Sequence, residues 1–342
     1  PLRMTGVRAA TEGLPLASVV NYAFGLFQVL VTLGVLLTCE IAQQVPRHED
    51  ERLINTQWTA FQLTFAGVLF HGAFIANFPS RSLMMDIPGM REIMNRFVSD
   101  ARMMWFMFAC LSAAYFLMAS DYHVVHEWPL AASLGSSGRK VYALRYLEWS
   151  VCTPLLAIVG CSGCKTADGT EIEHRLYGSA FNIGASCFAA WAGSVSTNLT
   201  AAWCLWVCAW ITHGLACWEH LPFAWKIRHA RCGGVNRAVM ICIFMGINTL
   251  YGIVYSFSLF DCISPMAEQR FWIFGDLSAK FLRAVLLQAL RHKDDQDLVE
   301  RIREAALEEE VKAKSIEAEE AAKQEQELQR KIAQAVESVS EL

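Results

Sequence analysis

Charged residues are scarce in the first 293 residues of this sequence, and apolar residues are scarce in the remainder. Over all 342 residues, 54% are hydrophobic, 18% are charged and the mean hydropathy is +0.29. Soluble domains are roughly 45–50% apolar. Because the apolar excess lies in long runs before residue 293, we expect a membrane domain followed by a polar, helix-prone tail.

A disulfide framework is also missing, although the sequence contains 12 cysteines. Most of them lie inside apolar segments, where cysteine behaves as a small, soft core residue. Cys161 and Cys164 form a CxxC pair, but no second CxxC or His pair stands at zinc spacing. We therefore expect no metal site. The net charge of −4 sums two unlike regions, and we expect no nucleic-acid partner.

Apolar segments of about 20 residues, the length that crosses a bilayer, occur eight times. They span residues 17–42, 57–78, 101–122, 141–163, 174–195, 198–219, 236–260 and 268–291. Eight crossings place both termini on one side, and that side carries most of the Lys and Arg residues of the loops. The positive-inside rule then predicts cytoplasmic termini. We expect an integral membrane protein of the plasma membrane.

The tail from residue 294 predicts one long helix, with two alternatives for its state. Apolar residues occupy a and d positions of a single heptad frame: Leu307, Val311, Ala318, Ala321, Leu328, Ile332, Ala335, Val339 and Leu342. Lys314 and Glu325 interrupt this frame. We favour a parallel two-stranded coiled coil that joins two protomers. The alternative is a single solvated helix stabilised by Glu–Lys pairs.

Charged residues inside spanning helices are costly and indicate function by default. In the last span, Asp276 and Lys280 lie one turn apart on one face. In the fourth span, Arg145, Glu148 and Cys152 share a face. These charges can neutralise one another. The residues alone support two interpretations equally: a structural ion network, or a site whose buried lysine performs Schiff-base chemistry.

Two motifs favour the second interpretation. Arg-Tyr-x-Glu-Trp-x-x-x-Thr-Pro-Leu-Leu at 145–156 resembles the third core helix of microbial rhodopsins, and Asp-Leu-Ser-Ala-Lys at 276–280 resembles their final helix. The resemblance covers about residues 57–291. It implies an all-α membrane fold: a seven-helix rhodopsin bundle, one extra N-terminal transmembrane helix and a C-terminal cytoplasmic helix. The expected regions are 1–50 (N-terminus, extra helix and start of the first outer loop), 51–293 (retinal-binding domain) and 294–342 (helical linker).

The resemblance also implies roles for individual residues. Lys280 would hold all-trans retinal through a protonated Schiff base, with Glu148 as principal counterion and proton acceptor and Asp276 as second counterion. Arg145 would order water and compensate these carboxylates. The retinal pocket would be formed by Trp149, Cys152, Thr153, Phe244, Asn248, Tyr251, Trp203, Trp206 and Trp210.

Departures from the pump pattern bear on the output. Val159 stands where pumps often have a carboxylate as cytoplasmic proton donor, so we expect slow reprotonation and a long-lived signalling state. The extra N-terminal span and the helical tail resemble enzyme-linked rhodopsins. Thr153 favours the rhodopsin phosphodiesterases over the rhodopsin guanylyl cyclases, which remain an alternative.

We therefore expect a light sensor that regulates a linked cytoplasmic cyclic-nucleotide phosphodiesterase. The catalytic domain is expected outside this chain, and cyclic nucleotide would bind only there. The expected partners are membrane lipid and a second copy of the chain, joined through membrane helices and the C-terminal helix. The other alternative is a light-gated channel or weak proton pump.

Overall fold

The computed structural model describes residues 16–45, 51–77, 90–120, 122, 124–135, 138–159, 176–229 and 234–340. The chain divides into two compact units, Pro1–Arg291 and His292–Leu342. Each unit is described on its own. Cys161 and Cys164, the CxxC pair, lie outside the described residues.

Long helices make up the first unit, and each overlaps one predicted span. Their bounds are α1 (Leu16–Thr38), α2 (Glu51–Ala76), α3 (Met90–Ala119), α5 (Ala143–Ile158), α6 (Tyr177–Val195), α7 (Leu199–Ile227), α8 (Gly234–Leu259) and α9 (Pro265–Ser340). Helices α2 and α3 begin earlier than predicted, and α5 is shorter. The last helix, α9, contains both the final predicted span and the tail.

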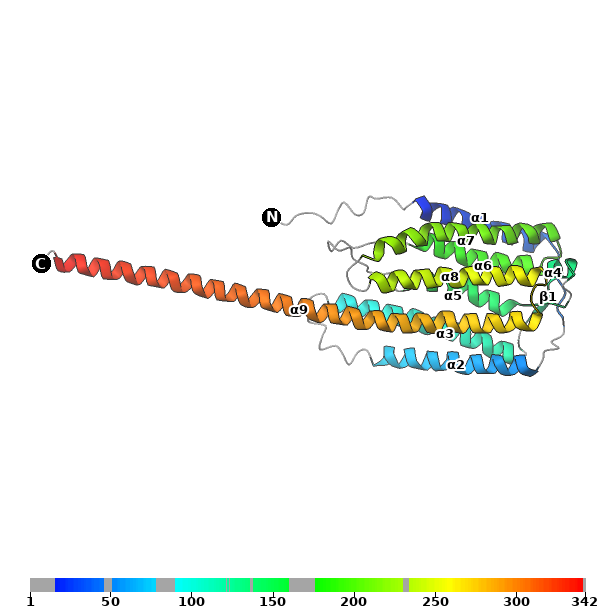
Figure 1. Cartoon of the computed structure of the whole chain (residues 1–342), viewed down its shortest axis with the longest axis horizontal. Helices are drawn as coiled ribbons and strands as arrows, with labels where there is room; N and C mark the ends of the chain where they lie inside the picture. Colours follow the sequence, from blue (N-terminus) through cyan, green and yellow to red (C-terminus); the bar gives the residue numbers. More distant parts are fainter. Residues whose placement is uncertain are drawn as a thin grey trace. The chain divides into compact units, whose positions relative to one another are not determined.

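The helices of the first unit lie side by side in one bundle (Figure 1). Along the chain, α2 packs on α3, α3 on α5, α5 on α6, α6 on α7 and α7 on α8. Helix α9 enters the bundle between α3, α5 and α8, because its residues bond to side chains or carbonyl groups of all three. The first helix, α1, packs against α6 and α7.

Helix α1 turns a polar stripe toward its neighbours and an apolar face outward. Its buried residues are Ser18, Asn21, Gly25, Gln28 and Thr32, whereas Leu26, Phe27, Leu30, Leu33 and Leu37 are exposed. Polar side chains between membrane helices hold them together through hydrogen bonds. The Asn21 amide donates to Glu219 Oε2 of α7 (3.2 Å) and accepts from Asn182 of α6 (2.9 Å). The bonding therefore ties this helix to two others.

The connection between α3 and α5 is a small hairpin that the sequence analysis did not predict. Strands β1 (Val125–Glu127) and β2 (Lys140–Tyr142) pair antiparallel, with Val125 opposite Tyr142, and the short helix α4 (Pro129–Ser133) lies between them. Residues 141 and 142, predicted as the start of the fourth span, are strand residues. Since α5 begins directly after β2, the hairpin fixes where that helix starts.

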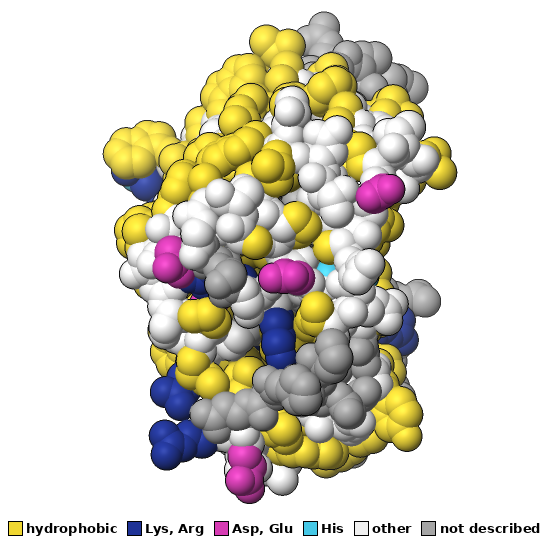
Figure 2. All heavy atoms as spheres, turned by 90° about the vertical axis from the view of Figure 1, so that its right-hand side faces the viewer, with side chains coloured by type: hydrophobic (Ala, Val, Ile, Leu, Met, Phe, Trp, Pro, Cys, Tyr) yellow, Lys and Arg dark blue, Asp and Glu magenta, His cyan; other side chains and the backbone are white. Residues whose placement is uncertain are grey.

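Buried Arg139 anchors this hairpin to the α8–α9 connection. Its guanidinium donates to Glu268 (2.6 Å), to Asp261 (3.0 Å) and to the carbonyl of Ile263. A buried guanidinium requires such partners. Figure 2 looks at this end of the bundle, where charged side chains of both signs are scattered and hydrophobic side chains cover much of the surface.

Five helices are long and apolar enough to cross a membrane by length and composition. They are α1, α2, Val98–Ala119 of α3, α7 and α8. The remaining three predicted spans differ in ways the sequence explains: α5 has 16 residues, α6 is rich in Gly, Ala and Ser, and α9 carries Asp276, Lys280 and Arg283. The chain is thus a helical membrane protein in which α5 and α9 carry buried charged residues.

Candidate functional site

The centre of the site is an ion pair between α9 and α5. Lys280 Nζ lies 2.8 Å from Glu148 Oε1, and the two residues are only 2% and 5% exposed. An uncompensated charge in such a place would cost several kcal/mol, so burial of either residue depends on the other. The pair joins the two helices whose motifs carried the resemblance.

Asp276 lies one turn before Lys280 and is held by three donors. Tyr115 of α3 donates to Oδ2 (2.8 Å), while Trp149 Nε1 of α5 (2.7 Å) and the Tyr251 hydroxyl of α8 (2.9 Å) donate to Oδ1. Gly275 allows the approach of Tyr251, because a Cβ there would lie 2.7 Å from the Tyr251 ring. The carboxylate is therefore fixed in orientation by three different helices.

Arg145 is buried one turn before Glu148 on α5. It donates to Gln269 Oε1 of α9 (2.5 Å), and its guanidinium carbon lies 5.3 Å from the centre of the Tyr142 ring. Among the residues that the structure describes, Arg145 Nε and Nη2 have no hydrogen-bond partner. These two donors suit the predicted role of binding water beside the carboxylates.

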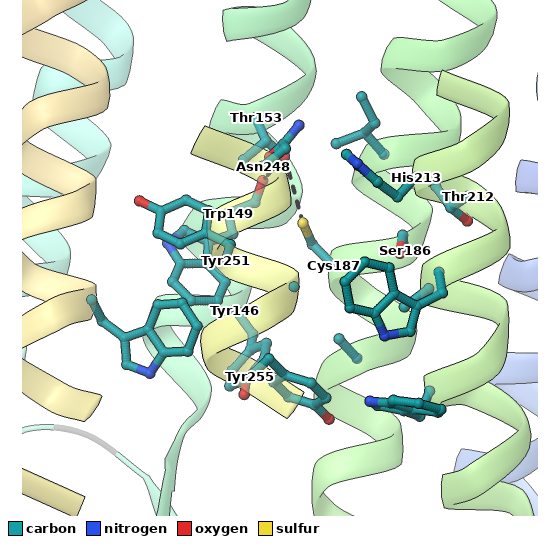
Figure 3. A pocket seen from close by; sticks show the side chains of 17 residues that line it. Tyr146, Trp149, Thr153, Ser186, Cys187, Thr212, His213, Asn248, Tyr251 and Tyr255 are labelled. Atoms are coloured by element: carbon teal, nitrogen blue, oxygen red, sulfur yellow. Dashed lines mark hydrogen bonds between the residues drawn. The ribbon is translucent and has the colours of Figure 1, made fainter. Parts of the chain in front are cut away.

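A cavity of about 130 Å³ has a wall rich in aromatic side chains, two of which, Trp149 and Tyr251, donate to Asp276 (Figure 3). Six predicted pocket residues line it: Trp149, Thr153, Asn248, Tyr251, Trp206 and Trp210. Its wall comes from α5, α6, α7, α8 and Trp272 of α9. Figure 3 shows Trp149 and Tyr251 on the α9 side of the cavity and His213 on the α7 side. The cavity therefore lies between α7 and the two residues, Trp149 and Tyr251, that donate to Asp276.

Trp149 belongs to both parts of the site. Its ring stacks on Tyr251 with centres 5.2 Å apart and meets Trp272 edge-on at 5.1 Å. Its Nε1 donates to Asp276 as described. One side chain thus forms the cavity wall and helps orient the carboxylate next to the lysine.

Three predicted pocket residues are not among those that line this cavity. Cys152 is fully buried with Sγ 4.0 Å from the Met107 carbonyl oxygen. Phe244 packs near Arg283, whose guanidinium carbon lies 5.6 Å from the ring centre. Trp203 packs edge-on against Trp206. Their predicted contact with a chromophore stays a prediction.

Other cavity residues were missed by the sequence analysis. They are Tyr146, Ile183, Ser186, Cys187, Ala190, Ala209, Thr212, His213, Gly252, Tyr255 and Trp272. Trp272 and Tyr255 could have been found, because each lies one turn from a predicted residue on the same face, Asp276 and Tyr251. Cys187 Sγ lies 3.6 Å from the Thr153 hydroxyl oxygen, but nothing in the sequence around Cys187 indicates that it lines a cavity. No group of His, Cys, Asp or Glu suited to a metal ion occurs within the described ranges.

Comparison with known proteins gives the family. The model of the bacteriorhodopsin-like protein family matches residues 85–294. No curated protein matches the sequence.

Solved structures with the same fold include a thermophilic rhodopsin from Rubrobacter xylanophilus, at 17% identity over 70% of this chain and 96% of that chain, with a TM-score of 0.54. They include a proton-pumping rhodopsin from the marine alga Acetabularia acetabulum, at 15% identity over 72% and 98%, with a TM-score of 0.55. The transmembrane domain and linker region of the Salpingoeca rosetta rhodopsin phosphodiesterase matches at 13% identity over 86% and 90%, with a TM-score of 0.56.

At these identities the structural likeness shows the fold alone, whereas the family model covers more than half of the chain. The chain therefore belongs to the bacteriorhodopsin-like family, the microbial rhodopsins, and this membership implies a retinal chromophore.

Proposed function

We propose that this chain is the light-sensing membrane part of a rhodopsin phosphodiesterase, with Lys280 as the attachment point for all-trans retinal. The observation that carries this proposal is the buried pair of Lys280 Nζ and Glu148 Oε1, 2.8 Å apart. A lysine held inside a membrane bundle beside a carboxylate and an aromatic cavity suits covalent binding of an aldehyde.

The residues of the cavity fit this group. Retinal is an apolar polyene, and the wall of the cavity includes the aromatic side chains of Trp149, Tyr251 and Trp206. Aromatic walls bury apolar ligands effectively. When bound, retinal supplies visible light absorption and a light-driven isomerisation.

The residues around Lys280 have separate tasks in this proposal. Glu148 compensates the positive charge at Nζ and accepts its proton at Oε1 after illumination. Asp276 adds a second negative charge whose position is fixed by Tyr115, Trp149 and Tyr251. Glu148 Oε1 faces Nζ directly at 2.8 Å, whereas both oxygens of Asp276 accept hydrogen bonds from other residues. Glu148 is therefore the better placed of the two to accept the proton.

We infer the output from features outside the ion site. The α1 helix and the α9 tail give this chain a layout like that of the Salpingoeca rosetta phosphodiesterase region, which matches 86% of it. In this proposal the bundle has eight spans, lies in the plasma membrane with both termini cytoplasmic, and forms a homodimer through membrane helices and a tail coiled coil. Catalysis belongs to a phosphodiesterase domain beyond this chain.

The proposal is tested first on the chromophore. Lys280→Ala protein supplied with all-trans retinal is expected to lack the visible absorption band of the wild type, because no amine remains there to form the Schiff base. Lys226→Ala, a change at an exposed lysine of α7, is the control and should keep the band. A normal band in the Lys280→Ala protein would overturn the proposal.

The output needs a separate measurement on the full-length protein. Hydrolysis of cyclic nucleotide that changes between darkness and light, and that is insensitive to light in Lys280→Ala, is the expected result. Light-dependent synthesis of cyclic nucleotide would instead indicate the cyclase group. A light-induced current or pH change without any such turnover would indicate a channel or pump.

A further inference from the structure

One buried charge on α9 has no part in the ion site. Arg283 lies one turn beyond Lys280 and is only 4% exposed. Its guanidinium donates to the carbonyl oxygens of Leu156 and Val159 (3.2 Å to Val159) at the end of α5, and to that of Met240 in α8 (2.9 Å). Arg283 therefore links α9 to α5 and α8, at the end of the bundle opposite Arg145.

The last carbonyl groups of a helix have no partners within it and attract positive charge. Helix α5 ends at Ile158, and Val159 is its C-terminal cap. Arg283 supplies the missing donors there. Residue 159 is also the position at which pump rhodopsins often have a proton-donor carboxylate. In this chain a guanidinium from another helix is bonded to the backbone of that residue.

We propose that Arg283 is a positioning residue that closes the path between this end of the bundle and Lys280, so that the proton lost from Lys280 Nζ returns from Glu148 and not from solvent. The inference rests on the proposed function of Lys280 and Glu148. During recovery, the O–H bond at Glu148 Oε1 breaks and the N–H bond at Nζ forms.

Two properties of arginine suit it to this role. Its guanidinium stays protonated in proteins and has no proton to give. A fixed positive charge in a poorly screened interior repels protons and cations over several ångströms, as arginine does in selective pores. The three carbonyl bonds hold this charge at the backbone of Val159, the residue that stands where pumps often have a donor.

Three substitutions separate the charge of Arg283 from its hydrogen bonds. Arg283→Lys keeps the charge, Arg283→Gln is neutral but retains a donor, and Arg283→Met has neither. The measurement is recovery of the dark absorption band after a flash, in protein containing all-trans retinal. We expect recovery about tenfold faster or more in the Gln and Met variants, and within about threefold of wild type in the Lys variant.

Arg139→Met is the matched control, because it removes another buried guanidinium at the opposite end of the bundle. It should lower stability without accelerating recovery. Slow recovery in the Gln variant together with fast recovery in the Lys variant would overturn the inference, since hydrogen bonds and not charge would then govern the rate. Unchanged recovery in both neutral variants would overturn it as well.

The dark band separates this inference from the proposed function. A variant that has the band but recovers at the wild-type rate contradicts only the role of Arg283, whereas a wild-type protein without a band contradicts the role of Lys280. If Arg283→Met does not fold, the Lys and Gln variants alone decide, because they differ in charge.

Discussion

The two carboxylates near Lys280 differ in their surroundings although both are buried. Glu148 faces the lysine directly at 2.8 Å, whereas both oxygens of Asp276 accept hydrogen bonds from Tyr115, Trp149 and Tyr251. Three donors from three helices fix the orientation of the Asp276 carboxylate. The two carboxylates therefore differ in their bonding partners, and substituting each in turn should show which of them is the principal counterion of Lys280.

Glu148→Gln is expected to shift the visible band strongly to longer wavelength. The carboxylate stabilises positive charge at Nζ in the dark state, and its loss narrows the gap to an excited state in which that charge is more spread out. Removing one partner of a buried ion pair also costs about 3–5 kcal/mol, so thermal stability of the band should fall. The absorption spectrum and its melting midpoint are the measurements.

Glu127→Gln provides the control for this change, because Glu127 is exposed at the end of β1. It should leave the spectrum as in the wild type. An unshifted band in Glu148→Gln, with a shifted band in Asp276→Asn, would assign the principal counterion to Asp276 instead.

For single residues, the sequence indicated which charged side chains are buried in the bundle better than it indicated which side chains pack around them. Lys280, Glu148, Asp276 and Arg145 were recognisable because charge within an apolar span is rare. The position of Phe244 beside Arg283 could not be predicted, because it depends on how α8 is rotated about its axis relative to α9. Rotations of this kind follow from packing across helices far apart in sequence.

The helices themselves were largely predictable, but their ends and their faces were not. Apolar length located each long helix but not its ends, since α3 begins at Met90 and its predicted span begins at residue 101. The hairpin before α5 has only three residues in each strand, which is too short to give a sequence pattern. The inward polar stripe of α1 was equally hidden, because hydropathy averages over the helix. Its exposed face is the more apolar one, as expected for a helix in contact with lipid.

Gly25 tests how closely α1 must approach α6. A Cβ at this position would lie 2.8 Å from the Phe181 ring and 3.0 Å from the Asn182 Cα atom, and backbone cannot move aside cheaply. Gly25→Val should cost about 1–3 kcal/mol through overpacking, seen as a melting midpoint lower by a few degrees. Gly34→Val on the same helix, where nothing lies within 4 Å, should melt like the wild type. Equal midpoints for both variants would contradict close docking of α1.

At the scale of the whole molecule, the two units differ in how they are stabilised. The first unit buries apolar and paired polar groups, whereas the described side chains of the tail are exposed and form Glu–Lys pairs one turn apart, such as Glu310–Lys314 and Glu319–Lys323. Such pairs contribute only about 0.3–0.5 kcal/mol each. They support either state of the tail, and the side chains of Leu328, Ile332, Ala335, Val339 and Leu342 lie outside the described part. The coiled coil thus stays a prediction.

Two residues of the heptad frame decide between these states. Leu307 and Val311 are each 61% exposed in the single chain, and a parallel coiled coil would bury them against the second copy. Leu307→Glu with Val311→Glu should therefore weaken the dimer, because like charges would meet at the seam. Light scattering of the detergent-solubilised protein over a range of dilutions measures the change in mass.

The matched control is Ile316→Glu, which alters an exposed apolar residue of the same helix outside the frame. It should leave the dimer intact. If the frame variant and the control dissociate at the same concentration, the tail is a solvated helix and any dimer forms through the membrane helices. If only the frame variant dissociates, and light control of the full-length protein is lost with it while the dark absorption band remains, the coiled coil is the element through which the state of Lys280 reaches the output.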